Sequence, residues 1–141
     1  MSSMSSKTEA LGRLELLNDC SLATCVEGQP YVRPMSLIFR EGRFFFATGA
    51  TSSKAEQVAV NPRVEVCVRF IEEEHSGYLR LRGELKPCVE EGVHVDLWGC
   101  VGFMEAFWTE PMSGEYMLLE LAPRWFEYME PGMLEVTRGS F

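Results

Sequence analysis

Apolar and polar residues alternate most regularly around residue 80. Leu79, Leu81, Gly83 and Leu85 would share one face of an extended chain, and the residues between them are charged. A period of two residues is typical of a β-strand with one buried and one exposed face. This segment is therefore predicted to be a strand that lies against the protein core.

Shorter segments rich in β-branched and aromatic residues predict further strands. Residues 27–30 and 40–42 have the glycine-containing composition of tight turns, so the first three strands should form a meander. A charged loop is expected over residues 72–77. The expected strands span 20–26, 31–39, 43–48 and 64–71, and three closing strands span 115–121, 124–129 and 134–137.

Three segments predict helices: residues 9–17, 53–60 and 89–107. In the second of these, Ser53 and Glu56 have the spacing of a capping box. Six or seven short strands joined mostly by tight turns, with few helices, predict a mainly β protein built as a closed antiparallel barrel. Neither a repeat nor a linker divides the sequence, so residues 1–141 are expected to form a single domain.

The charge balance narrows the classes of partner. The 141 residues include 21 acidic and 13 basic side chains, which gives a formal net charge of −8. Such a surface repels phosphate backbones and anionic lipids, so neither nucleic acid nor a membrane is an expected partner. No apolar stretch approaches the ~20 residues of a membrane span, and the first ten residues lack the apolar region of a signal peptide. These features predict a cytoplasmic protein.

The residues that commonly bind metals are scattered. Five cysteines form no Cys-x-x-Cys pair, and His75 and His94 lie far in sequence from any pair of cysteines. No metal site is predicted, and the cysteines are expected to be reduced and packed as small apolar groups. His94 and Asp96, two residues apart on a predicted helix, would not face each other, and both are expected to be solvated. Catalytic residues therefore stay unassigned.

The most informative segment is a predicted buried strand that runs directly into a predicted helix, in the sequence FFFATGATSSKAEQ. The beginning of a helix exposes unpaired backbone N–H groups and binds anions readily. Thr48, Ser52 and Ser53 add hydroxyl groups, and Lys54 adds a positive charge. A bound anion and a well-capped helix with a solvated lysine are both compatible with this pattern.

A second candidate is Arg33 in the apolar strand YVRPMSLIF. A buried guanidinium requires either an acidic partner or a bound anion, and its planar fork suits a phosphate. A salt bridge to Glu56 or Glu65 is the alternative. Pro34 removes one donor from the strand ladder, which leaves polar backbone groups over residues 34–36 free to meet a ligand.

Three segments in this order resemble the FMN-binding split-barrel proteins related to pyridoxamine 5′-phosphate oxidase. They are GQPYVRPMS, RFFFATGATSSKAEQVAVNPRVEV and YLRLRGELK, and the resemblance extends from about residue 14 to about residue 133. It implies a six- or seven-stranded antiparallel split β-barrel with FMN as the cofactor. By this resemblance, the flavin ring lies along the backbone of Pro34, Met35 and Ser36, Tyr78 lies against it, and the phosphate ligands are Arg33, Thr48, Ser52, Ser53 and Lys54.

Two departures separate this chain from the oxidase itself. Ser53 stands where the oxidase usually has an arginine, and the sequence ends at MLEVTRGSF without the arginine- and histidine-bearing tail that binds pyridoxine in the oxidase. The resemblance therefore favours the general-stress-protein-like or nitroreductase-like branch. The expected function is a flavin-dependent oxidoreductase acting on an unidentified small molecule. The alternatives are a non-catalytic flavin-binding or sensory protein, a deazaflavin-dependent reductase, and a cofactor-free interaction module.

A homodimer is expected for two reasons. Proteins of the resembling family hold the flavin between two subunits. In addition, Phe44, Phe45 and Phe46 are consecutive, so both faces of their strand need cover, and residues 98–108 are rich in aromatic side chains. Apolar surface of this kind usually marks an interface, and two-fold pairing is the commonest way to bury it.

Overall fold

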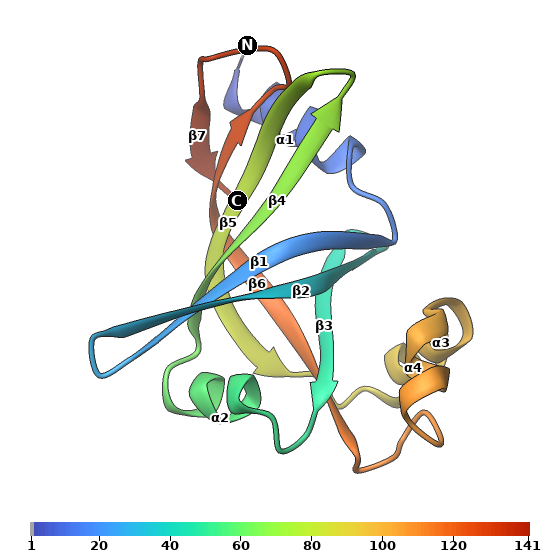
Figure 1. The fold of residues 1–141 in the computed structure, drawn as a ribbon. Helices are drawn as coiled ribbons and strands as arrows, with labels where there is room; N and C mark the ends of the chain where they lie inside the picture. The colour runs from blue at the N-terminus through green and yellow to red at the C-terminus, as the bar shows by residue number, and fades with distance from the viewer. Residues whose placement is uncertain (1) are drawn as a thin grey trace.

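The computed structural model describes residues 2–141 and has seven strands and four helices in that range. Figure 1 shows the strands wound into a barrel with the helices at its periphery. Within the described residues, no helix is long and apolar enough to cross a membrane. The elements are α1 (Ser3–Gly12), β1 (Leu17–Val26), β2 (Gln29–Arg40), β3 (Arg43–Gly49), α2 (Ser53–Val60), β4 (Arg63–Glu72), β5 (His75–Pro87), α3 (Glu91–Cys100), α4 (Gly102–Phe107), β6 (Tyr116–Met129) and β7 (Thr137–Ser140).

All strand pairings are antiparallel, and the order across the sheet is β3-β2-β1-β4-β5-β6-β7. An additional pairing between β3 and β6 runs from Phe44 opposite Leu121 to Gly49 opposite Tyr116 and closes the sheet on itself. The predicted meander of the first three strands is confirmed, and so are the predicted mainly β composition and the split-barrel fold.

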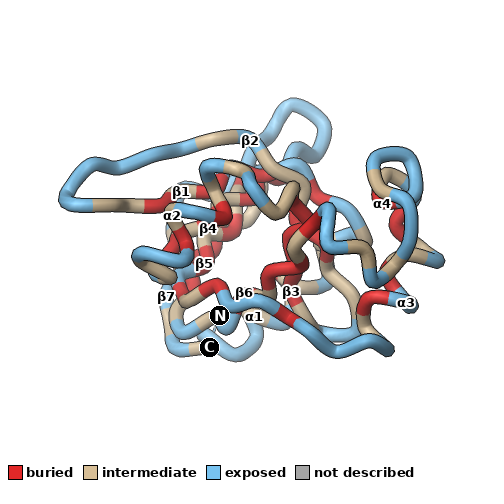
Figure 2. Tube along the Cα trace, turned by 90° about the horizontal axis from the view of Figure 1, so that it is seen from below, coloured by how far each residue is buried: buried red, intermediate tan, exposed pale blue. Residues whose placement is uncertain are grey.

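The main core fills the inside of this barrel. Figure 2 shows buried residues recurring along the strands that surround it. The alternation around residue 80 has the predicted effect, since Leu79, Leu81 and Leu85 are all at most 1% exposed. Phe44 and Phe46 point into the same core. The barrel is thus held together by alternate residues from each strand.

A second apolar cluster lies on the outside of the barrel, where α3 and α4 cover strands β2 and β3. It contains Ile38 and Phe45 from the strands and Leu97 and Met104 from the helices, all of which are buried. The chain itself therefore covers both faces of β3. The expectation that the three consecutive phenylalanines need a second subunit as cover is wrong.

The predicted helix over residues 89–107 is interrupted. Val101 has an extended conformation, with φ −103° and ψ 96°, and it both ends α3 and precedes α4. Its side chain is fully buried in the outer cluster. The break turns one predicted helix into a pair that folds over the sheet.

The predicted helix over residues 9–17 is also displaced, because α1 ends at Gly12 and Leu17 already belongs to β1. Asn18 accounts for the difference. Its side chain accepts a hydrogen bond from the amide of Glu15 and donates to the carbonyls of Glu15 and Leu37, which fixes a turn before the strand. Local bonding of this kind by asparagine competes with helix formation.

The last strands of the structure differ from the predicted ones in two ways. The two expected strands over residues 115–121 and 124–129 form one strand, β6, which passes through Pro123 at a register irregularity opposite Arg82 and Gly83. Leu134 lies outside any strand and is 95% exposed, and the final strand begins only at Thr137. Similarly, the predicted loop over residues 72–77 is reduced to a tight turn at residues 73–74, which joins β4 directly to β5.

Gly83 permits the close approach of β5 and β6 at this irregularity. A Cβ atom at this position would lie 2.1 Å from the backbone oxygen of Ala122, whereas one at Gly92 in α3 would have no atom within 4 Å. We expect Gly83→Ala to lower the free energy of unfolding by more than about 2 kcal/mol, because backbone must move to admit the methyl group. Gly92→Ala, the matched control, should change it by less than about 1 kcal/mol. Urea unfolding of both variants measures the difference. Equal stabilities of the two variants would contradict the close approach of β5 and β6 at Gly83.

Candidate functional site

A pocket of about 530 Å³ opens on the outer face of the barrel, where strands β1, β2 and β3 lie between α2 and α4. Figure 1 shows these two helices on either side of the end of β3. The strands supply the floor, the beginning of α2 one side, and the aromatic end of α4 the other. The lining residues are Asp19, Pro34, Met35, Ser36, Ala47, Thr48, Gly49, Lys54, Phe103, Phe107 and Trp108.

Five of the nine residues predicted from the sequence line this pocket. Pro34, Met35 and Ser36 lie on its floor, and Thr48 and Lys54 lie on the side towards α2. The strand register explains the floor, since Asp19 lies opposite Ser36 on the neighbouring strand. Sequence reasoning missed Asp19, although the pairing of the first two strands in the predicted meander was the signal that could have found it.

The beginning of α2 is capped by Ser52, one residue earlier than predicted. The Ser52 hydroxyl accepts a hydrogen bond of 3.2 Å from the amide of Ala55 and another of 3.1 Å from the Thr48 hydroxyl. Ser53 is the exposed first residue of the helix. The predicted capping box at Ser53 is wrong, because the residue three positions after the actual cap is an alanine.

This end of α2 offers several donors with no protein acceptor. Among residues 2–141, the backbone amides of Ser53 and Lys54 donate to no protein atom, and the Lys54 ammonium forms no ion pair. The partial positive charge of the helix end adds to that of the lysine. Beside the pocket, these groups would stabilise a bound anion.

Arg33 lies away from the pocket lining. It is opposite Leu22 on β1, and its guanidinium donates to the Leu22 carbonyl, to Thr24 Oγ1 at 2.9 Å and to Gln57 Oε1 of α2 at 2.6 Å. Burial lowers the pKa of Arg33 below its ordinary value. All three acceptors are neutral, so neither glutamate considered as a salt-bridge partner is used. In this arrangement Arg33 anchors α2 to the barrel.

Tyr78 belongs to a charged network on the outer face of β5 and β6, away from the lining of the pocket. Its hydroxyl donates to Glu127 at 2.6 Å, and the same carboxylate accepts from Arg80 at 2.8 Å and from Arg138 at 2.7 Å. The bond to Glu127 raises the pKa of Tyr78. Burial alone would raise the pKa of Glu127, which is 3% exposed, but the three donors outweigh burial and lower this pKa to about 2.

A buried histidine, His94, supports the aromatic side of the pocket through Tyr116. Trp108 stacks on Tyr116 with ring centroids 4.7 Å apart, and the Tyr116 hydroxyl lies 2.6 Å from His94 Nδ1. His94 Nε2 is 2.6 Å from the carbonyl of Cys88, to which it must donate. His94 is only 8% exposed, so the expectation that it is solvated is wrong. The signal that could have found it was its apolar neighbours on α3.

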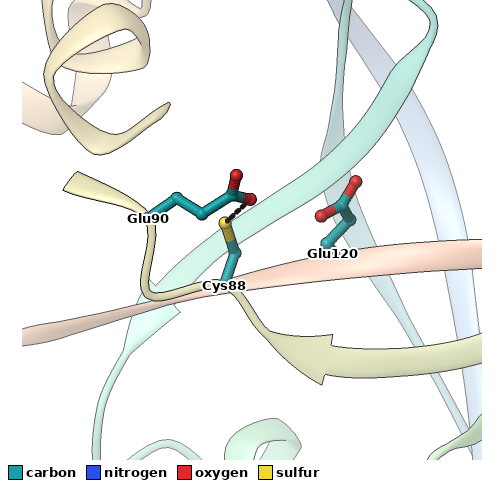
Figure 3. A group of neighbouring side chains, drawn as sticks. All are labelled: Cys88, Glu90 and Glu120. Carbon is teal, nitrogen blue, oxygen red and sulfur yellow. Dashed lines mark hydrogen bonds between the residues drawn. The ribbon is translucent and has the colours of Figure 1, made fainter. Parts of the chain in front are cut away.

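The neighbouring carboxylates and thiol shown in Figure 3 form an ion-pair cluster. Ligand atoms of Cys88, Glu90 and Glu120 lie within 4.8 Å of one another. However, the Arg43 guanidinium donates to both oxygens of Glu120 and to Glu90, each at 2.7–2.8 Å. Burial also raises the pKa of Cys88, which disfavours the thiolate that a metal would need. Arg43 already supplies the positive charge that these carboxylates require.

Comparison with known proteins identifies the family of this chain. A family model described as pyridoxamine 5′-phosphate oxidase matches residues 7–130, which is most of the sequence. A search of curated proteins gave no match.

Several solved structures share the fold at low sequence identity. General stress protein 26 from Bacillus anthracis is 18% identical, with a TM-score of 0.73 over 96% of this chain and 97% of that one. A heme-binding protein from Mycobacterium smegmatis is 13% identical, with a TM-score of 0.78 over 99% of this chain and 58% of that one. A FAD-binding protein from Mesorhizobium loti is 17% identical, with a TM-score of 0.70 over 89% and 92% of the two chains.

The depressed pKa of Glu127 predicts a pH-dependent stability. A carboxylate with a lowered folded-state pKa stabilises the fold above its unfolded pKa, and this contribution is lost as the pH falls from about 5 to about 2. We therefore expect Glu127→Gln to be less stable than the parent by about 2–3 kcal/mol at pH 7 and the gap to narrow below pH 5.

Glu74→Gln in the exposed turn between β4 and β5 is the matched control, and its stability should follow that of the parent at every pH. Chemical unfolding between pH 7 and pH 2.5 measures both variants. A gap for Glu127→Gln that stays constant across this range would show that the carboxylate charge is not what stabilises the network.

Proposed function

The chain belongs to the pyridoxamine 5′-phosphate oxidase family, and on this premise we propose that it is a flavoprotein that binds FMN in the pocket between α2 and α4. The observation that carries the proposal is the division of the pocket into two kinds of surface. One side has unpaired amides and a lysine, and the other has three aromatic rings. FMN has the matching division into a phosphate and a flat apolar ring system.

The phosphate would lie at the beginning of α2. The backbone amides of Ser53 and Lys54 and the Lys54 ammonium would donate to its oxygens, and the hydroxyls of Thr48 and Ser52 lie beside them. Hydrogen bonds to a charged group of this kind contribute about 1.5–3 kcal/mol each. Arg33 would act indirectly. Its guanidinium holds α2 in place through Gln57 and adds positive charge behind the helix.

The flavin ring would lie on the floor formed by Pro34, Met35 and Ser36. Phe103 and Trp108 would limit its access to water from the side of α4. When bound, the flavin supplies the redox chemistry, and the protein binds it, orients it and shapes access to its ring. We propose an oxidoreductase acting on a small molecule.

Haem is not proposed as the cofactor, even though one structural neighbour is described as heme-binding. Of the two histidines, His94 has both ring nitrogens within hydrogen-bonding distance of protein oxygens. His75 is exposed at the beginning of β5 and does not line the pocket. Neither side chain offers a free imidazole nitrogen in an enclosed apolar site.

We further propose that two copies pair through the outer face of the sheet. This face carries small or apolar exposed residues on β1 and β2, among them Ser21 and Val32, and Val32 is 73% exposed. The strand register places the outward residues of β4 and β5, including Tyr78, on the same face of the sheet. In such a pair, Tyr78 of one copy could contact the flavin of the other, although it does not line the pocket of its own chain.

The test of flavin binding compares FMN with riboflavin, which lacks the phosphate. We expect the parent protein to bind FMN with a dissociation constant in the micromolar range or tighter. Lys54→Ala should weaken FMN binding about ten- to a hundredfold and leave riboflavin binding unchanged, because it removes only a phosphate contact. Arg33→Ala should weaken FMN binding by less than Lys54→Ala does.

Quenching of flavin fluorescence measures these affinities. Lys86→Ala, at an exposed lysine on β5, is the matched control and should bind both flavins as the parent does. A Lys54→Ala variant with parental FMN affinity would refute the phosphate site. A protein that bound neither flavin would refute the proposed function.

The proposed pairing predicts the sedimenting mass. At micromolar concentration the protein should sediment with twice the 16.0 kDa mass of the chain. Val32→Arg should shift it towards the monomer and weaken FMN binding, because a buried unpaired charge opposes association. Met4→Arg, at an exposed position on α1, should do neither. A monomer with parental flavin affinity would contradict a site shared between two subunits.

A further inference from the structure

The side of the pocket formed by α4 has a composition unlike that of the phosphate side. Phe103, Phe107 and Trp108 are in mutual contact, with ring centroids 6.1–6.4 Å apart in tilted or edge-on geometry. Phe107 is 72% exposed and therefore lies at the open edge of the pocket. These three residues are called the aromatic wall below.

Two of the three residues of the aromatic wall are held in place by packing from behind. Trp108 is stacked on Tyr116 at an interplanar angle of 20°, and Tyr116 is in turn held by the buried His94. Phe103 packs against the outer apolar cluster under α3 and α4. A fixed wall binds a flat ligand without the entropic cost of ordering its side chains.

The segment that carries the aromatic wall has a net negative charge. Residues 87–123, which include α3, α4 and the wall, contain seven acidic side chains and neither a lysine nor an arginine. Three of the seven, Glu90, Asp96 and Glu120, form ion pairs with arginines of β2 and β3. Asp19 adds a carboxylate to the floor of the same pocket. Lys54 is the one basic residue in the lining, and in the proposed function it is neutralised by the flavin phosphate.

From this arrangement we propose that the aromatic wall binds the substrate, and that the substrate is a planar aromatic molecule that is uncharged or cationic. The inference rests on the proposed function, because it assumes that the flavin occupies the floor beside Lys54. It extends that function by assigning the class of the second ligand. Aromatic rings stack or meet edge to face with such molecules and attract cations through their π faces.

The same charges exclude anions. A phosphorylated or sulfonated aromatic ligand at the wall would find no cation within α3 or α4 and would face the carboxylate of Asp19. Repulsion between two like charges about 4 Å apart in water weakens binding about fivefold, and the effect is larger where water is excluded. Selection by charge therefore accompanies selection by shape.

The test uses three unreactive bicyclic probes of similar size: 1-naphthalenemethanol, which is neutral, N-methylquinolinium, which is cationic, and 1-naphthalenesulfonate, which is anionic. Each is titrated calorimetrically into FMN-saturated protein while the fluorescence of released flavin is monitored. We expect the neutral and cationic probes to bind at least about tenfold more tightly than the sulfonate, without release of flavin.

Two variants connect this preference to the wall. Phe107→Ala should weaken the binding of the neutral and cationic probes about three- to tenfold. Val60→Ala, at a similarly exposed apolar residue on α2, should leave their binding unchanged. Asp19→Asn should weaken only the cationic probe, and Glu74→Gln should change none of the three. Thermal unfolding of each variant confirms that its fold is intact.

The outcomes separate this inference from the proposed function. Equal or tighter binding of the sulfonate, parental probe affinity in Phe107→Ala, or displacement of FMN by the neutral and cationic probes would overturn the inference while leaving flavin binding in place. If the protein binds no flavin, the proposed function fails by itself. The same titrations on flavin-free protein then decide whether the wall still selects against anions.

Discussion

The pairing of β3 with β6 is the contact on which the remainder of the structure depends. It joins residues 67 to 77 positions apart in the chain and turns an open sheet into a barrel. Without it, Phe44 and Phe46 would have no enclosed core to fill. It also brings the end of β3 beside Tyr116, so that the side of the pocket formed by α2 and the aromatic wall come from distant segments.

As a consequence of this closure, β3 is apolar on both faces, which is unusual for a strand at the surface of a small antiparallel barrel. Alternate residues of the strand serve two separate cores, and Phe45 lies under α3 and α4. The helices are thus required for burial as well as for the pocket. Because Val101 breaks the helical segment, α4 can turn and place its aromatic residues at the edge of the pocket.

The features that the sequence predicted well are those encoded locally. The alternation around Leu81 defines its strand, and the segment from Ser53 to Val60 forms the predicted helix. The family resemblance named Thr48 and Lys54 together, and both line one pocket. Side-chain partners were harder to foresee, because Arg33 reaches Gln57 of α2 only after the pairing of β1 with β2 has fixed the position of Arg33.

His94 shows the same limit more clearly. Its burial depends on Tyr116, which follows 22 residues later and reaches it only through the closure of β6 against β3. No periodicity within α3 contains that information. The sequence pattern could show that the neighbours of His94 were apolar, but not that a hydroxyl and a carbonyl would satisfy both of its ring nitrogens.

An anion site in a chain of net charge −8 requires that local donors outweigh the overall field. Distant carboxylates are screened over about 8–10 Å at physiological ionic strength, whereas a lysine and two amides in contact with a phosphate are not. The structure concentrates these donors at the beginning of α2, places aromatic side chains on the opposite wall and adds the Asp19 carboxylate to the floor. The donors thus lie at one end of the pocket only, which would fix the orientation of a bound amphipathic anion such as FMN.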